Sequence, residues 1–131
     1  MTSDELTEFA KRYAKAWCSH NPESVAAFFA ENASLTVNGG PATPALEIAR
    51  GFMRDFPDMI VTFDKLETRA DRTAFRWTLI GTNTGRGGTG NRVRISGYEL
   101  WKIDNDGLIA ESSGQFDVAE YERQLKHGLE P

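Results

Sequence analysis

Two stretches of the sequence look like short motifs that bind phosphate or metal ions, and neither is complete. Residues 85–90 (GRGGTG) are rich in glycine, as phosphate-binding loops are, but they lack the lysine and the serine or threonine that end such a loop. Residues 104–107 (DNDG) begin like a calcium-binding loop, yet no glutamate stands at its twelfth position. We therefore expect a flexible hairpin loop at the first stretch and a tight turn at the second.

Metal-ligating and nucleophilic side chains are also sparse. Cys18 is the only cysteine, and His20 and His127 are the only histidines, so no set of zinc ligands is present. No serine or cysteine stands with a histidine in a recognisable triad pattern. The sequence predicts neither a metal site nor a bound cofactor.

The sequence ESSGQFD (residues 111–117) follows an apolar stretch that is typical of a core strand. Serine and glycine are poor strand formers, and here they occupy positions at which a reactive side chain could stand. Because side chains alternate along a strand, Ser112, Gly114 and Phe116 share one face, and the small residues would enlarge a cavity on that side. Gln115 then points to the opposite face.

Length and charge limit the classes of function. A chain of 131 residues is the size of one domain with a single core, and we treat residues 1–131 as that domain. The net charge of −4 argues against a nucleic-acid-binding face, and no apolar run is long enough to cross a membrane. Without a signal peptide, and with a single cysteine, we expect a cytoplasmic protein that acts on a small molecule or on another protein.

The first half of the chain has helical spacing. Between residues 3 and 19 the large apolar side chains recur every three or four positions, with charged residues between them. The start signal NPE at residues 21–23 predicts a short helix that runs through Phe29. A similar signal at residues 43–44 (TP) predicts a third helix, which ends at Phe56.

After Pro57 the apolar spacing changes to alternation, which is typical of strands. Short polar turns and the glycine-rich stretch separate the runs, so we expect successive strands to pair antiparallel as a meander. Helices followed by an antiparallel sheet indicate an α+β fold, in which the helices cover the apolar face and leave space for a ligand. The predicted strands are 59–67, 73–82, 92–103 and 108–117, followed by a short helix at 118–125.

The chain contains, in this order, the phrases KRYAKAW, HNPESVAAFFAENASL, DFPDM, RWTLIGTNTG and TGNRVRISGYELWKIDNDGLIAE. In order and spacing they resemble the SnoaL-like branch of the nuclear transport factor 2 superfamily, and the likeness covers nearly the whole chain. It implies a cone of three N-terminal helices packed on a curved, mainly antiparallel sheet, with an internal pocket. It also implies a homodimer joined through the outer face of the sheet. Because this superfamily includes isomerases, cyclases, dehydratases and members that only bind, the resemblance implies a fold more specifically than a reaction.

The resemblance also implies roles for particular residues. Tyr13, in KRY, matches a tyrosine of ketosteroid isomerases that donates a hydrogen bond to the substrate carbonyl. Glu99, in GYELW, matches a second, acidic donor on the third strand of those enzymes. Val37 stands in place of the isomerase base, and Gly114 stands in place of the acid-base aspartate of the cyclases. The chain thus keeps both donors and lacks the usual base of either scheme.

Two functions stay open. The first is cofactor-free isomerase, cyclase or dehydratase chemistry on a small hydrophobic carbonyl compound, which Tyr13 and Glu99 polarise. The alternative is a non-catalytic domain that binds a small molecule or another protein. Both proposed catalytic residues could also have a purely structural role. Tyr13 could be a core residue, and Glu99 could form an exposed ion pair with Arg76 or Arg94. The residues expected to line the pocket are Trp17, Phe52, Phe56, Phe75, Trp77, Trp101, Ser112, Gly114 and Phe116.

Overall fold

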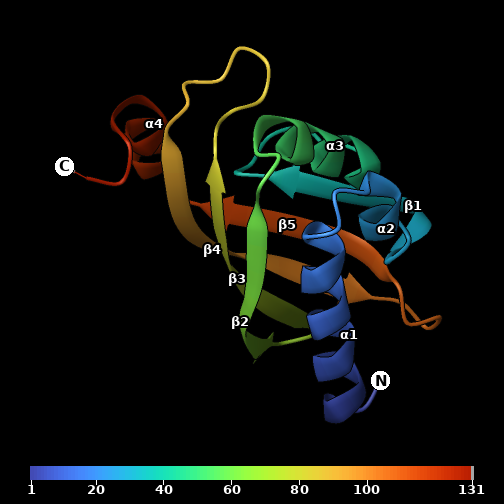
Figure 1. Cartoon of the computed structure of the whole chain (residues 1–131). Helices are drawn as coiled ribbons and strands as arrows, with labels where there is room; N and C mark the ends of the chain where they lie inside the picture. Colours follow the sequence, from blue (N-terminus) through green and yellow to red (C-terminus); the bar gives the residue numbers. More distant parts are fainter. Residues whose placement is uncertain (131) are drawn as a thin grey trace.

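The computed structural model describes residues 1–130, which form four helices and one five-stranded sheet (Figure 1). The elements are α1 (Ser3–Trp17), α2 (Pro22–Ala26), β1 (Phe29–Val37), α3 (Ala45–Asp55), β2 (Ile60–Arg69), β3 (Arg72–Thr82), β4 (Arg92–Ile103), β5 (Ile109–Phe116) and α4 (Val118–His127). The strand order is β1-β5-β4-β3-β2; β1 runs parallel to β5, and the other neighbouring pairs are antiparallel. This arrangement confirms the predicted α+β fold with a mainly antiparallel sheet. Among residues 1–130, no helix is both long and apolar enough to span a bilayer.

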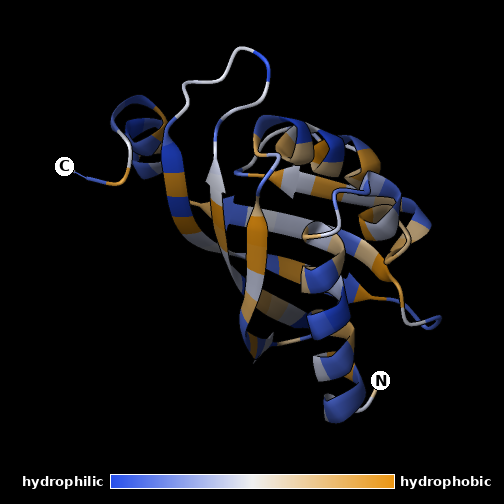
Figure 2. Ribbon diagram, in the orientation of Figure 1, coloured by the Kyte–Doolittle hydropathy of each residue, from blue (hydrophilic) through white to orange (hydrophobic). Residues whose placement is uncertain are grey.

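Helix α1 is defined by a capping signal at its start and by one apolar face. Thr2 and Glu5 form a capping box: Thr2 Oγ1 accepts the Glu5 N–H at 3.1 Å, and Glu5 Oε1 accepts the Thr2 N–H at 2.9 Å. Phe9, Tyr13 and Trp17 are buried, whereas hydrophilic residues cover the side of the helix that faces solvent (Figure 2). The apolar face therefore turns Tyr13 toward the interior of the fold.

The segment after α2 differs from the prediction. The expected short helix through Phe29 ends at Ala26, and Phe29–Val37 forms strand β1. The strand is held by its parallel pairing with β5, which lies far along the chain, and its register shifts between Phe29 and Ser34. Exposed polar residues at 31–32 break the alternation that would mark a strand in the sequence. The predicted meander corresponds to β2–β5, and β1 adds a parallel fifth strand.

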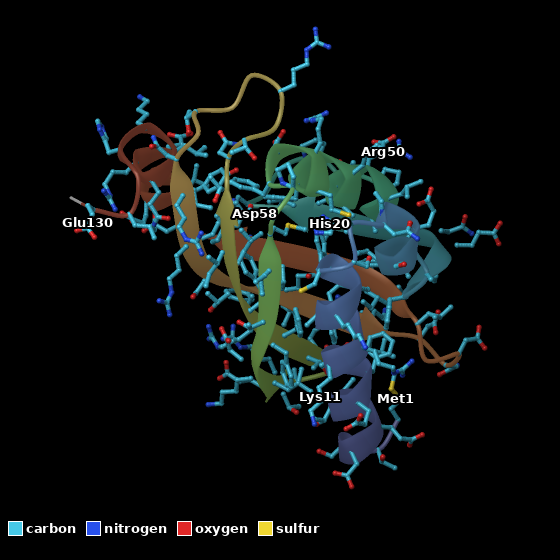
Figure 3. The ribbon with its side chains drawn as sticks, viewed as in Figure 1. Met1, Lys11, His20, Arg50, Asp58 and Glu130 are labelled. Atoms are coloured by element: carbon cyan, nitrogen blue, oxygen red, sulfur yellow. The ribbon has the colours of Figure 1, made fainter. Side chains whose placement is uncertain are left out.

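Charged side chains lie on the outside of both layers. Lys11 of α1 and Arg50 of α3 are exposed at the helical surface (Figure 3). On the outer face of the sheet, the guanidinium groups of Arg69 and Arg76 lie over the ring of Tyr98, at 5.1 and 5.5 Å from its centroid. The homodimer expected through this face stays a prediction.

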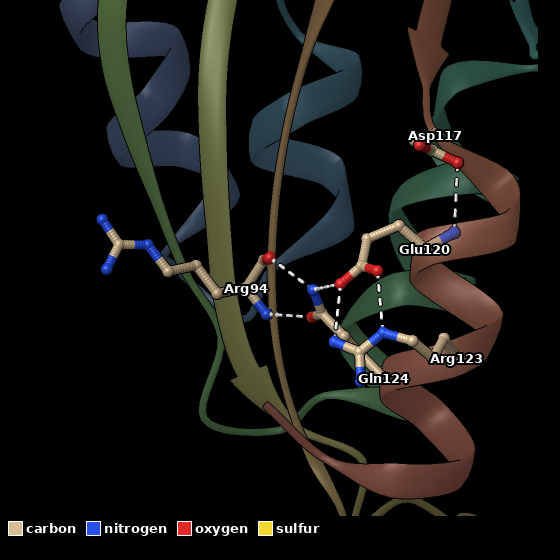
Figure 4. A network of polar contacts seen from close by, with 5 residues as sticks. All are labelled: Arg94, Asp117, Glu120, Arg123 and Gln124. Atoms are coloured by element: carbon tan, nitrogen blue, oxygen red, sulfur yellow. Dashed lines mark hydrogen bonds and ion pairs between the residues drawn. The ribbon is translucent and has the colours of Figure 1, made fainter. Parts of the chain in front are cut away.

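Helix α4 covers a part of β4 that lies beyond the pairing with β5. The ladder between β4 and β5 reaches only to Gly97↔Phe116. Beyond that point the buried side chain of Gln124 takes the place of a neighbouring strand (Figure 4). The Arg94 N–H donates to Gln124 Oε1 at 2.6 Å, and Gln124 Nε2 donates to the Arg94 carbonyl oxygen at 3.0 Å. A side-chain amide thus satisfies both backbone groups of a sheet residue.

The Gln124 side chain is itself held by its own helix. Asp117 caps α4, because its Oδ1 accepts the Glu120 N–H at 3.1 Å. Gln124 Nε2 donates to Glu120 Oε2 at 2.6 Å, and Arg123 donates to both carboxylate oxygens of Glu120 at 2.8 Å (Figure 4). The bonds from Arg123 and then from Gln124 lower the pKa of Glu120 to about 2. Glu120 therefore stays charged in neutral solution and keeps its bond to Gln124.

We predict that Gln124→Ala destabilises the protein by about 1–3 kcal/mol, because it removes both partners of the Arg94 backbone. Urea unfolding measures the change in the free energy of unfolding. Glu122→Ala is the matched control, since Glu122 is exposed on the same helix. Equal effects of the two substitutions would contradict the role assigned to Gln124.

Candidate functional site

An apolar pocket lies between helices α1 and α3 and the inner face of the sheet. It contains about 530 Å³ of space, part of which is open to solvent. Alternation on β3, β4 and β5 directs every second side chain toward it, and the apolar faces of α1 and α3 close the opposite side. The lining residues are Trp17, Leu35, Val37, Ile48, Phe52, Val61, Phe75, Trp77, Leu79, Glu99, Gly114 and Phe116.

Glu99 is the one ionisable side chain among the residues that line the pocket, and it is 6% exposed. Ser112 Oγ donates to Glu99 Oε1 at 2.8 Å, and Trp101 Nε1 donates to the same oxygen at 3.2 Å. The Tyr13 hydroxyl lies 2.9 Å from Oε1 and 3.0 Å from Oε2. Donors from α1, β4 and β5 therefore converge on one oxygen of a buried carboxyl group.

Burial changes the acidity of both members of the Tyr13–Glu99 pair. It raises the pKa of Glu99 above the ordinary value of 4.5, and the hydrogen bonds from Ser112, Tyr13 and Trp101 offset part of that rise. Burial also raises the pKa of Tyr13 well above its ordinary value, and a charge on Glu99 raises it further. Tyr13 therefore stays protonated in neutral solution and can donate to Glu99. Glu99 keeps its acid form to a higher pH than an exposed glutamate does.

Neither arginine considered as a partner of Glu99 pairs with it. Arg76 forms an ion pair with Glu67, and Arg94 is exposed, whereas Glu99 is buried. Within residues 1–130, no group of three or more His, Cys, Asp or Glu side chains is placed to hold a metal ion. The polar chemistry of the pocket is thus concentrated at Glu99.

Tyr13 lies behind Glu99 rather than in the wall of the pocket. Its side chain is fully buried, and the rings of Phe28, Phe75 and Trp101 surround it at centroid distances of 5.2–5.5 Å. It is not among the residues that line the pocket. The structure thus brings the two predicted catalytic residues together, but Glu99 alone reaches the space that a ligand would occupy.

Three of the residues expected to line the pocket lie elsewhere. Phe56 packs near Tyr121 of α4, at a centroid distance of 6.3 Å. Trp101 stacks on Phe75 at 4.9 Å and turns its N–H to Glu99, and the hydroxyl of Ser112 is likewise taken up by Glu99. The expected residues that the structure does place in the lining are Trp17, Phe52, Phe75, Trp77, Gly114 and Phe116.

The sequence analysis missed the aliphatic part of the lining. Val61 and Leu79 are cross-strand partners on β2 and β3, and the alternation of the predicted strands already places them on the inner face. Ile48 lies one helical turn before Phe52 on α3, which places both on one helix face. Leu35 lacked such a signal, because its strand was not predicted, and Val37 was named only as the residue in place of the isomerase base. The omitted lining residues are Leu35, Val37, Ile48, Val61 and Leu79.

The two positions that lack the usual acid-base residues lie in one line across the sheet with Glu99. Across the sheet, Val37 of β1 is in register with Gly114 of β5, and Gly114 is in register with Glu99 of β4. All three line the pocket. We call Val37, Gly114 and Glu99 the acid-base row. Only Glu99 in this row carries an ionisable group.

Comparison with known proteins agrees with this architecture. AclR from Streptomyces galilaeus is 18% identical over 99% of this chain and 86% of its own, with a TM-score of 0.81. SalBIII is an epoxide hydrolase/cyclase-like enzyme in pyran ring formation of the polyether salinomycin; it is 15% identical over 92% of this chain and 97% of its own, with a TM-score of 0.76. A ketosteroid isomerase-like protein from Catenulispora acidiphila, in complex with trimethylamine, is 16% identical over 92% of this chain and 90% of its own, with a TM-score of 0.70.

At these identities the likeness concerns the fold. No curated protein matches the chain. The family match, in contrast, covers residues 7–125, which is most of the sequence. The chain belongs to the SnoaL-like polyketide cyclase family.

Proposed function

We propose that the pocket binds a small hydrophobic carbonyl compound and that Glu99 polarises the carbonyl oxygen. The supporting observation is the lining itself, in which one buried carboxyl group stands among aromatic and aliphatic side chains. Such a pocket favours an apolar ligand with a single polar function, because any second polar group would lose its water without gaining a partner.

The hydrogen bonds around Glu99 support its acid form as the one that meets the ligand. Oε1 accepts bonds from Ser112 and Trp101, whereas Oε2 has only the Tyr13 hydroxyl near it, at 3.0 Å. A neutral carboxyl group then carries its proton on Oε2, where it can be donated to a carbonyl oxygen. Tyr13 is in this arrangement a positioning residue that acts through Glu99, rather than the direct donor expected from the resemblance.

One carboxyl group is sufficient for reactions that move a single proton within one substrate. Glu99 first gives its proton to the carbonyl oxygen, and the carboxylate that results accepts a proton from a neighbouring carbon or hydroxyl group of the same substrate. Glu99 thereby returns to its acid form, and the carbonyl compound has become an enol or a closed ring. Enolisation, which is the first half of a double-bond isomerisation, and closure of a hydroxy ketone to a cyclic hemiketal fit this scheme, and its efficiency depends on a raised pKa at Glu99. Dehydration of a β-hydroxy ketone fits a variant of it, in which Glu99 gives its proton to the departing hydroxyl group, water leaves, and the carboxylate accepts the proton of the α-carbon.

A binding domain without catalysis is the second candidate. It is favoured by Val37 and Gly114, which leave the acid-base row with no separate base. Under this alternative the same ligand binds at Glu99 and dissociates unchanged.

The raised pKa of Glu99 predicts how stability depends on pH. The folded protein holds this proton more tightly than the unfolded chain, so its contribution to stability is complete below pH 4.5 and is lost as pH rises through the folded pKa. Once the pH exceeds the folded pKa, the free energy of unfolding has fallen by about 1.4 kcal/mol for each unit by which the folded pKa exceeds the unfolded one. Urea unfolding of Glu99→Gln should lack this loss, so the variant gains stability relative to the parent as pH rises. A difference that stays constant with pH would contradict the raised pKa.

Ligand binding provides a second pH test, for which β-tetralone is a suitable apolar ketone. Its affinity for the parent protein should fall as pH rises through the pKa of Glu99, because the carboxylate cannot donate to the ketone. Glu99→Gln keeps an amide donor and should bind with an affinity that does not change with pH. Tetralin, which lacks the oxygen, controls for apolar contact. Affinity that increases with pH in the parent would overturn the assigned donor role.

Catalysis is tested by exchange of the protons next to the β-tetralone carbonyl in deuterated water, followed by NMR. We expect the parent protein to accelerate exchange and Glu99→Gln to lose about 10²–10⁴-fold of that acceleration. Tyr13→Phe should lower the rate less, because it removes one of three donors to Glu99. If β-tetralone binds without accelerated exchange, the proposed chemistry fails on this ketone and the binding alternative is supported.

A further inference from the structure

Gly114 occupies the middle of the acid-base row, and the fold itself does not require a glycine there. A Cβ at this position would meet only Thr36 O at 3.5 Å and Glu99 Cγ at 3.8 Å, which are ordinary contact distances. At Gly97 of β4 the situation is opposite, because a Cβ would lie 2.3 Å from Gln115 O. Gly97 is needed for close backbone approach, whereas an alanine fits at Gly114.

A glycine inside a strand nevertheless lowers stability relative to alanine, since it loses more backbone freedom on folding. Gly114 is buried, lies in the sheet next to Glu99 and does not have the positive φ that favours glycine. The remaining consequence of its missing side chain is space on the pocket side of the sheet, beside the Glu99 side chain. That space is where the part of a ligand adjacent to its polar group would lie.

We propose that Gly114 is a specificity-determining residue, which admits ligands with a branched carbon next to the carbonyl group. The inference rests on the proposed binding of a carbonyl compound at Glu99. Gly114 of β5 is in register with Glu99 and both line the pocket, so a ketone bound at Glu99 places the carbon next to its carbonyl group within reach of position 114. A methyl group at residue 114 would occupy the volume that these substituents need. An unbranched ketone would keep its contacts.

The test compares Gly114→Ala with the parent protein on two ligands. The first is β-tetralone, and the second is its derivative with two methyl groups on the carbon between the carbonyl and the aromatic ring. We expect the parent to bind both. Gly114→Ala should bind the dimethyl compound about tenfold more weakly or worse, while its affinity for β-tetralone changes by less than about threefold. Gly51→Ala is the matched control, since a Cβ there meets nothing within 4 Å, and it should leave both affinities unchanged.

The outcomes separate this inference from the proposed function. A parent protein that binds neither ketone overturns both. A parent that binds β-tetralone but rejects the dimethyl compound retains the proposed function and overturns the role of Gly114. Equal losses for the two ketones in Gly114→Ala also overturn it, because they would indicate a general disturbance of the pocket. Thermal unfolding of Gly114→Ala checks that the variant is folded, and we expect it to be at least as stable as the parent.

Discussion

A carboxyl group buried among aromatic rings must be hydrogen-bonded, and this requirement links the main parts of the structure. An unpaired polar group in such a place would cost several kcal/mol, which is a large fraction of the stability of a small domain. Glu99 avoids this cost through donors on α1, β4 and β5. The helix must therefore cross the sheet where Tyr13 meets Glu99. The ladder between β4 and β5 must also place Ser112 beside it.

The aromatic core follows from the same constraint. Tyr13 can donate to Glu99 only if its ring passes through the layer between helix and sheet, and Phe28, Phe75 and Trp101 pack edge-to-face around it. Trp101 contributes both a stacking surface and an N–H group, so its position serves packing and polarity together. The network and the core thus stabilise each other, and the ligand space begins where the network ends.

The sequence predicted the elements whose signals are local. The apolar stripe of α1 and the alternation of β2–β5 depend on spacing within each segment, and the structure has both. Strand β1 depends on parallel pairing with a distant partner, and its segment shows no alternation. At the site, family resemblance selected Tyr13 and Glu99. Sequence could not reveal that Trp101 and Ser112 turn to Glu99 instead of the pocket, because side-chain direction depends on packing.

The acid-base row also has a geometric consequence. Adjacent strands lie about 4.8 Å apart, which is close to the reach of a glutamate side chain. An acid on either of two neighbouring strands can therefore reach a ligand held in the same place, provided that the residue opposite it is small. Glu99 and Gly114 stand in this relation, since they are in register with each other and both line the pocket. In a sheet of this kind the place of a polar group in the pocket wall belongs to the row of residues rather than to any single one of them.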